Sequence, residues 1–160
     1  MDERIAANRR LWDEWARINQ ESAFYDMAAF RAGATSLKPI ELEEVGPVAG
    51  KSLLHLQCHF GQDTLSWARL GAKVTGVDLS PEAIRRAQAL AAELKLDARF
   101  VCSDVLQLDA LGDEQFDLVF ASYGALIWLP DLECWAGTVA RHLKPGGMFH
   151  LVEFHPAIGM

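Results

Sequence analysis

The stretch from Ser52 to Ser80, SLLHLQCHFGQDTLSWARLGAKVTGVDLS, constrains the fold of this chain more than any other part. It joins a short apolar run, a loop that contains Gly61, two helical turns and a β-branched run that ends at Asp78. Gly71 stands where a helix end favours a left-handed residue. A strand, a crossover helix and a second strand within about thirty residues form a right-handed parallel βαβ unit. Such a unit brings the loop after its first strand beside the acidic end of its second strand, which suits a nucleoside with a charged tail.

The remainder of the chain continues this alternation. Apolar periodicity, capping residues and glycine or proline stops predict each element. The predicted helices are Asp2 to about Gln20, one that starts around Ser36–Pro39 and stops at Gly46, Asp63–Leu70, Pro81 to about Leu96, and Asp131–Leu143. Phe24–Phe30 is expected either to extend the first helix or to form a second short one. The predicted strands are Ser52–Leu56, Lys73–Val77, Ala98–Cys102, Phe116–Ala121 and, after a turn at Lys144–Gly147, Met148–Phe154.

This order of elements predicts an α/β fold with a doubly wound parallel sheet of about five strands. Residues 1–50 are expected to form an N-terminal helical extension, and residues 51–160 the ligand-binding domain. In open parallel sheets the ligand lies beyond the carboxyl ends of the strands. The loop 57–61, Asp78, Asp104 and Ser122 are therefore expected to meet at one edge of the sheet.

Composition narrows the class of protein. The 160 residues suffice for one domain with a sizeable core, and a net charge of −7 disfavours nonspecific binding to nucleic acid. The three cysteines are odd in number and far apart, so neither a disulfide framework nor a zinc knuckle is expected. A reducing, cytoplasmic location fits them. The charged start MDERIAANRR lacks the apolar segment of a signal peptide, and no apolar run approaches the roughly 20 residues that span a bilayer.

Several motifs, in order and at matching spacing, give the chain a family resemblance. They are LLHLQCHFG, the acid in VTGVDLSPEAI, the aspartate in FVCSDV, FDLVFAS, and LKPGG before the fifth strand. From about Lys51 to Phe154 the chain resembles class I S-adenosylmethionine-dependent methyltransferases. The stretch from SLKPIELEEVG to VTGVD also resembles a subgroup of uncharacterised members with LQCHFG in place of the glycine-rich loop. The resemblance implies a Rossmann-like fold, S-adenosyl-L-methionine as cofactor and methyl transfer to an acceptor, for which we expect a small molecule.

The resemblance also implies a set of cofactor-binding residues. They are Gln57, Cys58, His59, Gly61, Asp78, Leu79, Asp104, Val105 and Ser122. The first four would surround the methionine end of the cofactor, largely through the backbone. Asp78 would accept hydrogen bonds from both ribose hydroxyls, and Leu79 would pack on the adenine. Asp104 and Val105 would bind the adenine amino group and ring nitrogen, and Ser122 would lie beneath the methyl group.

The loop after the first strand departs from the family pattern, which is acid-x-Gly-x-Gly-x-Gly. His55 stands at the acid position, Gln57 and His59 replace the first two glycines, and only Gly61 is kept. Because glycine permits a positive φ, we expect either an ordinary backbone at Gln57 and His59 or a different loop. His55 and His59 lie on a strand and its loop, so they share no helical face and we expect no metal site. The absence of a G-x-G-x-x-G fingerprint makes a nucleotide-dependent oxidoreductase a distant alternative.

No catalytic residue can be assigned, because methyl transfer mainly requires alignment of two partners and exclusion of water. The candidates for the acceptor side are Trp12, Tyr25, Tyr123, Glu153 and His155. Two tryptophans on the first helix predict packing against the body, a lid over the pocket, or both. Cys58 is expected to be a packed residue, Trp135 a core residue, and Trp128 a core residue or a wall of the pocket.

The last predicted strand has no successor in this sequence. The family's sheet normally continues with two more strands, whereas the sequence given stops at Met160. The fifth strand is then an edge that exposes apolar residues, a liability for aggregation. We expect a fragment of a longer enzyme or self-association through this strand. A cofactor-binding domain without turnover therefore stays open as an alternative function.

Overall fold

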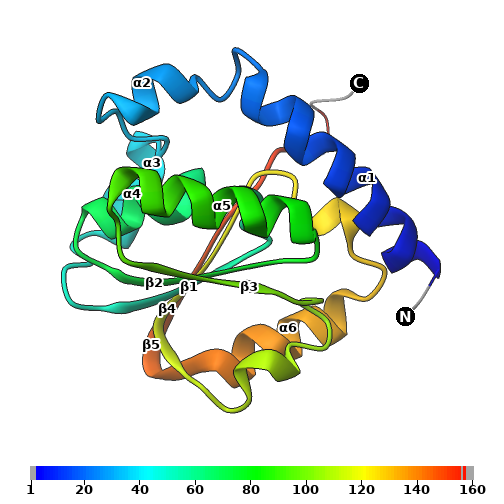
Figure 1. The fold of residues 1–160 in the computed structure, drawn as a ribbon. Coiled ribbons are helices and arrows are strands. Elements are labelled where there is room, and N and C mark those ends of the chain that lie inside the picture. The colour runs from blue at the N-terminus through cyan, green and yellow to red at the C-terminus, as the bar shows by residue number, and fades with distance from the viewer. Residues whose placement is uncertain (1–2, 156, 158–160) are drawn as a thin grey trace.

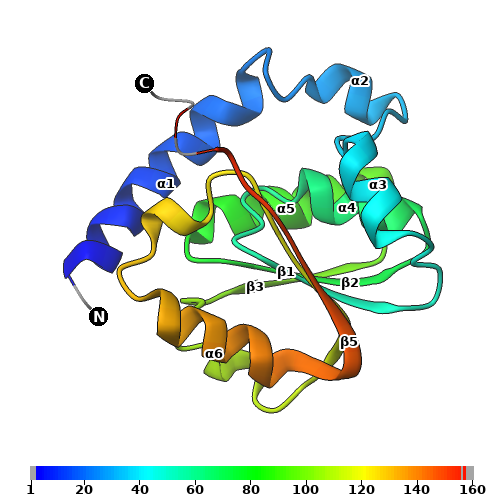
Figure 2. The ribbon, with the colours of Figure 1, turned by 180° about the vertical axis from the view of Figure 1, so that it is seen from behind.

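The computed structural model describes residues 3–155 and 157. A five-stranded sheet separates two layers of helices, with α4 and α5 on one face and α6 on the other (Figures 1 and 2). The strands are β1 (Ser52–Leu56), β2 (Lys73–Asp78), β3 (Ala98–Cys102), β4 (Phe116–Ser122) and β5 (Leu143–Val152). The helices are α1 (Glu3–Glu21), α2 (Met27–Arg31), α3 (Pro39–Val45), α4 (Gln62–Arg69), α5 (Pro81–Leu94) and α6 (Leu132–His142), with short 3-10 turns at Asp109–Leu111 and Leu126–Trp128.

The strand order is β3-β2-β1-β4-β5, and every neighbouring pair is parallel. The order reverses between β1 and β4, because the chain winds outward first through β2 and β3 and then through β4 and β5. This arrangement confirms the predicted doubly wound sheet. It places the carboxyl ends of β1 and β4 at the switch point, where such sheets bind ligands.

The central strand β1 is apolar because both of its faces are covered. Leu54 and Leu56 pack toward α6 in a cluster with Trp135, whereas Leu53 packs on the opposite face in a cluster with Trp67. All of these side chains are buried. The sheet is thus held between two largely apolar layers, although His55 in β1 and Thr75 in β2 are buried polar residues within it.

Both predicted boundaries of the edge strand differ from the structure, since the prediction was Met148–Phe154 and β5 spans Leu143–Val152. β5 begins at Leu143, and the predicted turn at Lys144–Gly147 is an irregularity inside the strand, since Phe116 pairs with Leu143 and Leu118 with Met148. Gly146 supplies a left-handed residue there, with φ of 76°. An edge strand tolerates Pro145 and a bulge because its outer side needs no regular ladder.

The helices that precede the sheet are packed against it, not separate from it. α1 lies along α5 (Figure 1). Where the two helices meet, the Asp13 carboxylate accepts a hydrogen bond from Ser80 Oγ at 2.5 Å. α3 is tied to β5 by Glu44 Oε2 and His150 Nε2, 2.8 Å apart. Asp2, the predicted start of the first helix, lies outside the described residues, as does Met160. In the part of the chain that the structure describes, no helix has the length and apolarity to cross a membrane.

Candidate functional site

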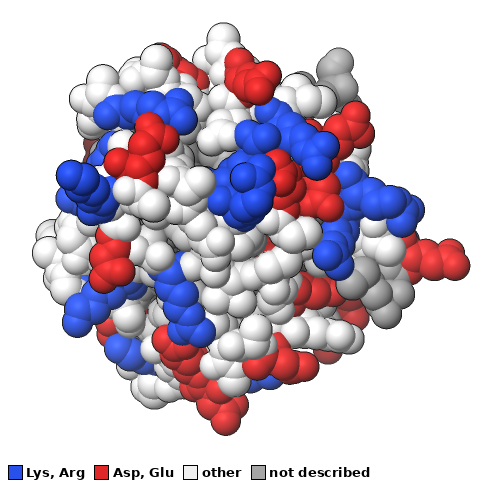
Figure 3. Space-filling view, viewed as in Figure 1, with Lys and Arg blue, Asp and Glu red and all other residues white. Residues whose placement is uncertain are grey.

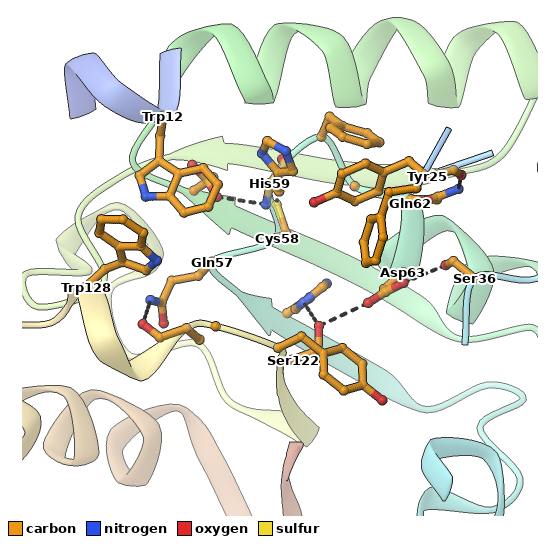
Figure 4. A pocket seen from close by; sticks show the side chains of 18 of the residues that line it. Trp12, Tyr25, Ser36, Gln57, Cys58, His59, Gln62, Asp63, Ser122 and Trp128 are labelled. Carbon is orange, nitrogen blue, oxygen red and sulfur yellow. Dashed lines mark hydrogen bonds between the residues drawn. The ribbon is translucent and has the colours of Figure 1, made fainter. Parts of the chain in front are cut away.

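A cavity of about 580 Å³ opens at the carboxyl ends of β1, β2 and β4 (Figure 4). The nine residues predicted to bind the cofactor all line this one cavity. They are Gln57, Cys58, His59, Gly61, Asp78, Leu79, Asp104, Val105 and Ser122. The structure therefore brings together segments that are far apart in the sequence, while the contacts that each residue makes with a ligand stay a prediction.

The loop after β1 keeps a left-handed backbone without its glycines. φ is 56° at Gln57, 51° at His59 and 80° at Gly61, so an ordinary backbone at the first two residues, one of the two expectations, is wrong. Tertiary hydrogen bonds hold these strained residues. Gln57 Nε2 donates to the carbonyl oxygen of Ala125 at 2.7 Å, and the backbone N–H of His59 donates to Asp78 at 2.8 Å.

Gly61 is required for a different reason, namely close packing. A Cβ at this position would come within 2.7 Å of the Phe100 ring and 3.0 Å of the Ala87 side chain. The ring of Phe100 in β3 likewise allows no side chain at Gly76 in β2, where a Cβ would lie 2.8 Å from it. Gly61, the third glycine of the family pattern, is thus required because the side chains of Phe100 in β3 and Ala87 in α5 leave no room for a Cβ.

The Asp78 carboxylate is buried and held by backbone donors from two sides. One oxygen accepts from the N–H of His59 at 2.8 Å, and the other from the N–H of Ser80 at 2.9 Å. Burial raises the pKa of Asp78 to about 6, although these hydrogen bonds lower it in part. A carboxylate has about four acceptor positions, so Asp78 can still accept further hydrogen bonds from a ligand.

The other predicted residues lie at the ends of β3 and β4. Asp104 accepts a hydrogen bond from the N–H of Leu106 at 2.9 Å, which closes a tight turn, and Val105 is buried beside it. Ser122 ends β4 and donates to Asp63 Oδ2 at 3.0 Å. The side chain of Ser122 is thus fixed toward the centre of the cavity wall (Figure 4).

Aromatic rings from α1 and from the loop after β4 close one side of the cavity. The Trp12 ring makes edge contacts with His59 at 5.2 Å and with Trp128 at 5.4 Å between ring centroids (Figure 4). Asn8 Nδ2 also donates to the carbonyl oxygen of Trp128 at 2.8 Å. α1 therefore both packs on the body and covers the cavity. Trp128 is a wall of the cavity, whereas Trp135 is buried in the core as predicted.

The candidates for the acceptor side divide into two groups. Trp12, Tyr25 and Tyr123 line the cavity, but Glu153 and His155 are not among its lining residues. The Glu153 carboxylate instead accepts hydrogen bonds from the backbone N–H groups of Ala125 and Leu126, at 2.9 and 3.1 Å, and His155 is exposed. A role of Glu153 and His155 on the acceptor side therefore stays a prediction.

Two further side chains of the loop clarify its chemistry. Burial raises the pKa of the Cys58 thiol, in keeping with a packed residue and not a nucleophile. Burial lowers the pKa of His59 to about 4, so its imidazole is neutral at pH 7. Within residues 3–155 and 157, no group of three or more His, Cys, Asp or Glu side chains could hold a metal ion.

The sequence-based prediction missed several polar residues of the cavity wall. They are Asn8, Ser36, Lys38 and Asp63. Asp63 had a usable signal, because an acid in the first helical turn directly after the cofactor loop points back toward that loop. Ser36 and Asn8 had none, since they reach the cavity only through the packing of the first fifty residues.

An open parallel sheet with a cavity at its switch point, a buried carboxylate after the second strand and a tight loop after the first defines a nucleotide-type binding protein of the α/β class. The family described as "Methyltransferase domain" matches residues 53–147, and the chain belongs to this family. The Rossmann-like fold expected from the resemblance is confirmed.

Individual relatives agree with this assignment. The chain is 34% identical over 155 residues to a ubiquinone biosynthesis O-methyltransferase of Methylobacterium sp. (strain 4-46), covering 92% of this chain and 58% of that protein. It is similar to the crystal structure of the PH0226 protein from Pyrococcus horikoshii OT3, with 25% identity and a TM-score of 0.71, over 86% of this chain and 64% of the other.

A further solved relative contains the expected cofactor. The glycopeptide N-methyltransferase MtfA in complex with S-adenosyl-L-methionine is 27% identical, with a TM-score of 0.60, over 68% of this chain and 49% of that protein. At the level of the family, S-adenosyl-L-methionine as cofactor is thus confirmed. The chain spans 56% and 58% of the length of two curated relatives that it matches.

Proposed function

We propose that this chain binds S-adenosyl-L-methionine in the cavity and supports transfer of its methyl group to a small-molecule acceptor. The observation that carries the proposal is the convergence of all nine predicted residues on one cavity at the switch point. In this proposal residues 51–160 form the cofactor domain and residues 1–50 its covering extension. It also includes membership of the LQCHFG-type subgroup and a location in the cytoplasm, where the three unpaired cysteines would stay reduced.

The groups on the cavity wall suit this cofactor. Asp78 offers free acceptor positions for ribose hydroxyls, and Asp104 offers an acceptor for the adenine amino group. Two buried polar atoms of the loop, Gln57 Oε1 and His59 Nδ1, have no partner among the described residues. Buried polar atoms require partners, and a polar ligand could supply them.

The reaction itself places few demands on the protein. When bound, the cofactor supplies an electrophilic methyl group on sulfur. The chain's own residues would align the acceptor and exclude water, which is the part that Trp12, Tyr25 and Trp128 can perform as an aromatic cover. Tyr123 would border the acceptor next to Ser122.

The kind of acceptor is supported by the shape and charge of the protein. The cavity is lined mostly by aromatic and polar side chains, which suits a small organic molecule. On the face drawn in Figure 3, basic and acidic residues alternate without a large basic patch. Arg31 pairs with Glu93, and Arg85 with Glu82, at 2.7 Å each. Relatives named as an O-methyltransferase and an N-methyltransferase support oxygen or nitrogen as the attacked atom.

Calorimetric titration of S-adenosylmethionine and S-adenosylhomocysteine tests the proposal. We expect the wild-type chain to bind both, and Asp78→Ala to bind them at least about tenfold more weakly, because it loses hydrogen bonds to a charged group. NAD serves as a control ligand and should not bind. Failure of a folded wild-type chain to bind either compound would refute the proposal.

A second measurement separates the enzyme from a binding domain without turnover. Purified chain, labelled cofactor and a panel of small phenols, amines and carboxylates would be assayed for transfer of the labelled methyl group. Transfer that exceeds the rate in the absence of protein supports the methyltransferase. Tight cofactor binding without transfer to any acceptor would favour the second function.

A further inference from the structure

Asp63 places a carboxylate at the centre of the cavity wall, between β1 and β4. It lies in the first turn of α4, two residues after Gly61, and it lines the cavity. Its Oδ1 accepts a hydrogen bond from Ser36 Oγ at 2.6 Å, and its Oδ2 accepts one from Ser122 Oγ at 3.0 Å (Figure 4). Three separate segments thus converge on this one side chain.

Within the described part of the chain, no salt bridge neutralises Asp63, and Lys38, which lines the same cavity, instead places its Nζ 4.0 Å from the centre of the Tyr123 ring. Among the described residues, no lysine or arginine forms an ion pair with it. His55, which contacts the same Ser122 hydroxyl as Asp63, is buried. Burial lowers the pKa of His55 to about 4 despite the opposing effect of the Asp63 charge, so the imidazole is neutral at pH 7.

The hydrogen bonds of the neutral His55 ring also leave the negative charge of Asp63 without a cationic partner. His55 Nδ1 lies 2.8 Å from Thr64 Oγ1, and Nε2 lies 3.4 Å from Ser122 Oγ. A relay in which Thr64 donates to His55, His55 to Ser122 and Ser122 to Asp63 satisfies all of these groups. It ends on an anionic carboxylate with acceptor positions still free.

The other acids of the cavity wall are already engaged by backbone donors. Asp78 accepts from two backbone N–H groups, Asp104 from that of Leu106, and Asp26 from that of Ala29 as the N-cap of α2. Among the residues that the structure describes, Asp63 accepts hydrogen bonds only from hydroxyl groups, which can rotate toward another partner. It is therefore the carboxylate best prepared to receive a cationic group from a ligand.

We propose that Asp63 binds the α-ammonium group of the methionine part of the cofactor and makes the site selective for ligands with an amino acid tail. The inference rests on the proposed function, which puts that tail beside the loop 57–61 and Ser122. An ammonium group has three donors and no acceptor, so an anionic carboxylate is its natural partner. The family pattern has an acid at the position of His55. Here His55 and Asp63 contact the same Ser122 hydroxyl. The carboxylate therefore comes from Asp63 in α4, whereas the family pattern has it in the first strand, at the position of His55.

The test compares two ligands that differ only in the amino acid tail. S-adenosylhomocysteine carries the ammonium group, and 5′-methylthioadenosine keeps the adenine, ribose and thioether but lacks the tail. Both are titrated by calorimetry into the wild type, Asp63→Asn and Asp63→Glu. Asp131→Asn, which removes the same charge from the N-cap of α6 on the other face of the sheet, is the matched control. Thermal melting establishes that each variant is folded.

We expect Asp63→Asn to weaken S-adenosylhomocysteine binding roughly 10- to 100-fold, as for loss of a hydrogen bond to a charged group, and to leave 5′-methylthioadenosine binding unchanged. Asp63→Glu should restore part of the difference, and Asp131→Asn should match the wild type. If Asp63→Asn weakened the binding of both ligands equally, or of neither, the result would overturn the inference and leave the proposed function intact. A folded wild type that binds neither ligand would overturn both.

Discussion

At the scale of single residues, two buried histidines make the fold sensitive to acid. Burial lowers the pKa of His55 and of His59 to about 4, below the ordinary value of 6.5. Their contribution to stability is therefore complete above pH 6.5 and is lost as the pH falls through 4. Asp78 acts in the opposite sense. Its pKa is raised to about 6 by burial, so its contribution is complete below pH 3.8 and is lost as the pH rises through 6.

Two histidines outweigh one aspartate over this range. Between pH 7 and pH 5 we expect the free energy of unfolding to fall by about 2–3 kcal/mol, and the melting temperature by roughly 5–10 °C. Melting curves at both pH values measure this. His55→Gln should show a smaller decrease, and His155→Gln, at an exposed position, should behave like the wild type. An identical decrease in His55→Gln would contradict the assignment to His55.

Some features of single residues at the cavity could be predicted from the sequence, and others could not. The positions of Asp78 and Asp104 at the cavity were predictable, because Asp78 ends one plainly patterned strand, Asp104 follows another, and parallel strands end at one edge of the sheet. The left-handed backbone of Gln57 and His59 was not predictable from local preferences. It depends on tertiary partners, namely the Ala125 carbonyl and the Asp78 carboxylate, which lie far away in the sequence.

At the scale of elements, α1 covers the cavity and is held to α5 mainly by hydrogen bonds. Asp13 accepts hydrogen bonds from Ser80 Oγ and from the N–H of Glu82 at the start of α5. The Arg86 guanidinium donates a hydrogen bond to Gln20 Oε1 near the other end of α1. Because few apolar side chains of α1 are buried, these contacts decide how tightly it covers the cavity.

Asp13→Ala should loosen this cover. The lost hydrogen bonds are worth about 1 kcal/mol, so we expect amide exchange in α1 to accelerate and cofactor affinity to fall roughly fivefold. Hydrogen exchange followed by mass spectrometry measures the first effect, and calorimetry the second. Glu14→Ala, on the exposed side of the same helix, is the matched control. Unchanged exchange in α1 would argue that packing alone holds the helix.

Elements with clear end signals were predicted closely. Ser80 and Pro81 start α5, and the Ser80 side chain accepts from the N–H of Ala83 as an N-cap should. The start of β5 was predicted five residues late, at Met148, because proline and two glycines in a row indicate a turn. At the edge of this sheet, Pro145, Gly146 and Gly147 form a bulge within β5. The local sequence alone does not distinguish such a bulge from a turn.

At the scale of the whole molecule, β5 forms one edge of the sheet. In the described residues β5 has no strand on its outer side, and Met148 and Phe149 are 43% and 38% exposed. A long edge strand with exposed apolar residues can pair with another chain. We therefore predict that this chain self-associates through β5 as its concentration rises.

Met148→Lys puts a charge on the exposed edge, which blunts such edges in natural sheets. It should raise the concentration at which half of the chains associate by roughly tenfold, through lost apolar burial and like-charge repulsion across the interface. Sedimentation velocity over a range of concentrations measures this. Leu70→Lys, at an exposed apolar position after α4, controls for surface apolarity in general. If the wild type sediments as a monomer at every concentration, or if both variants shift equally, β5 is not the surface through which the chains associate.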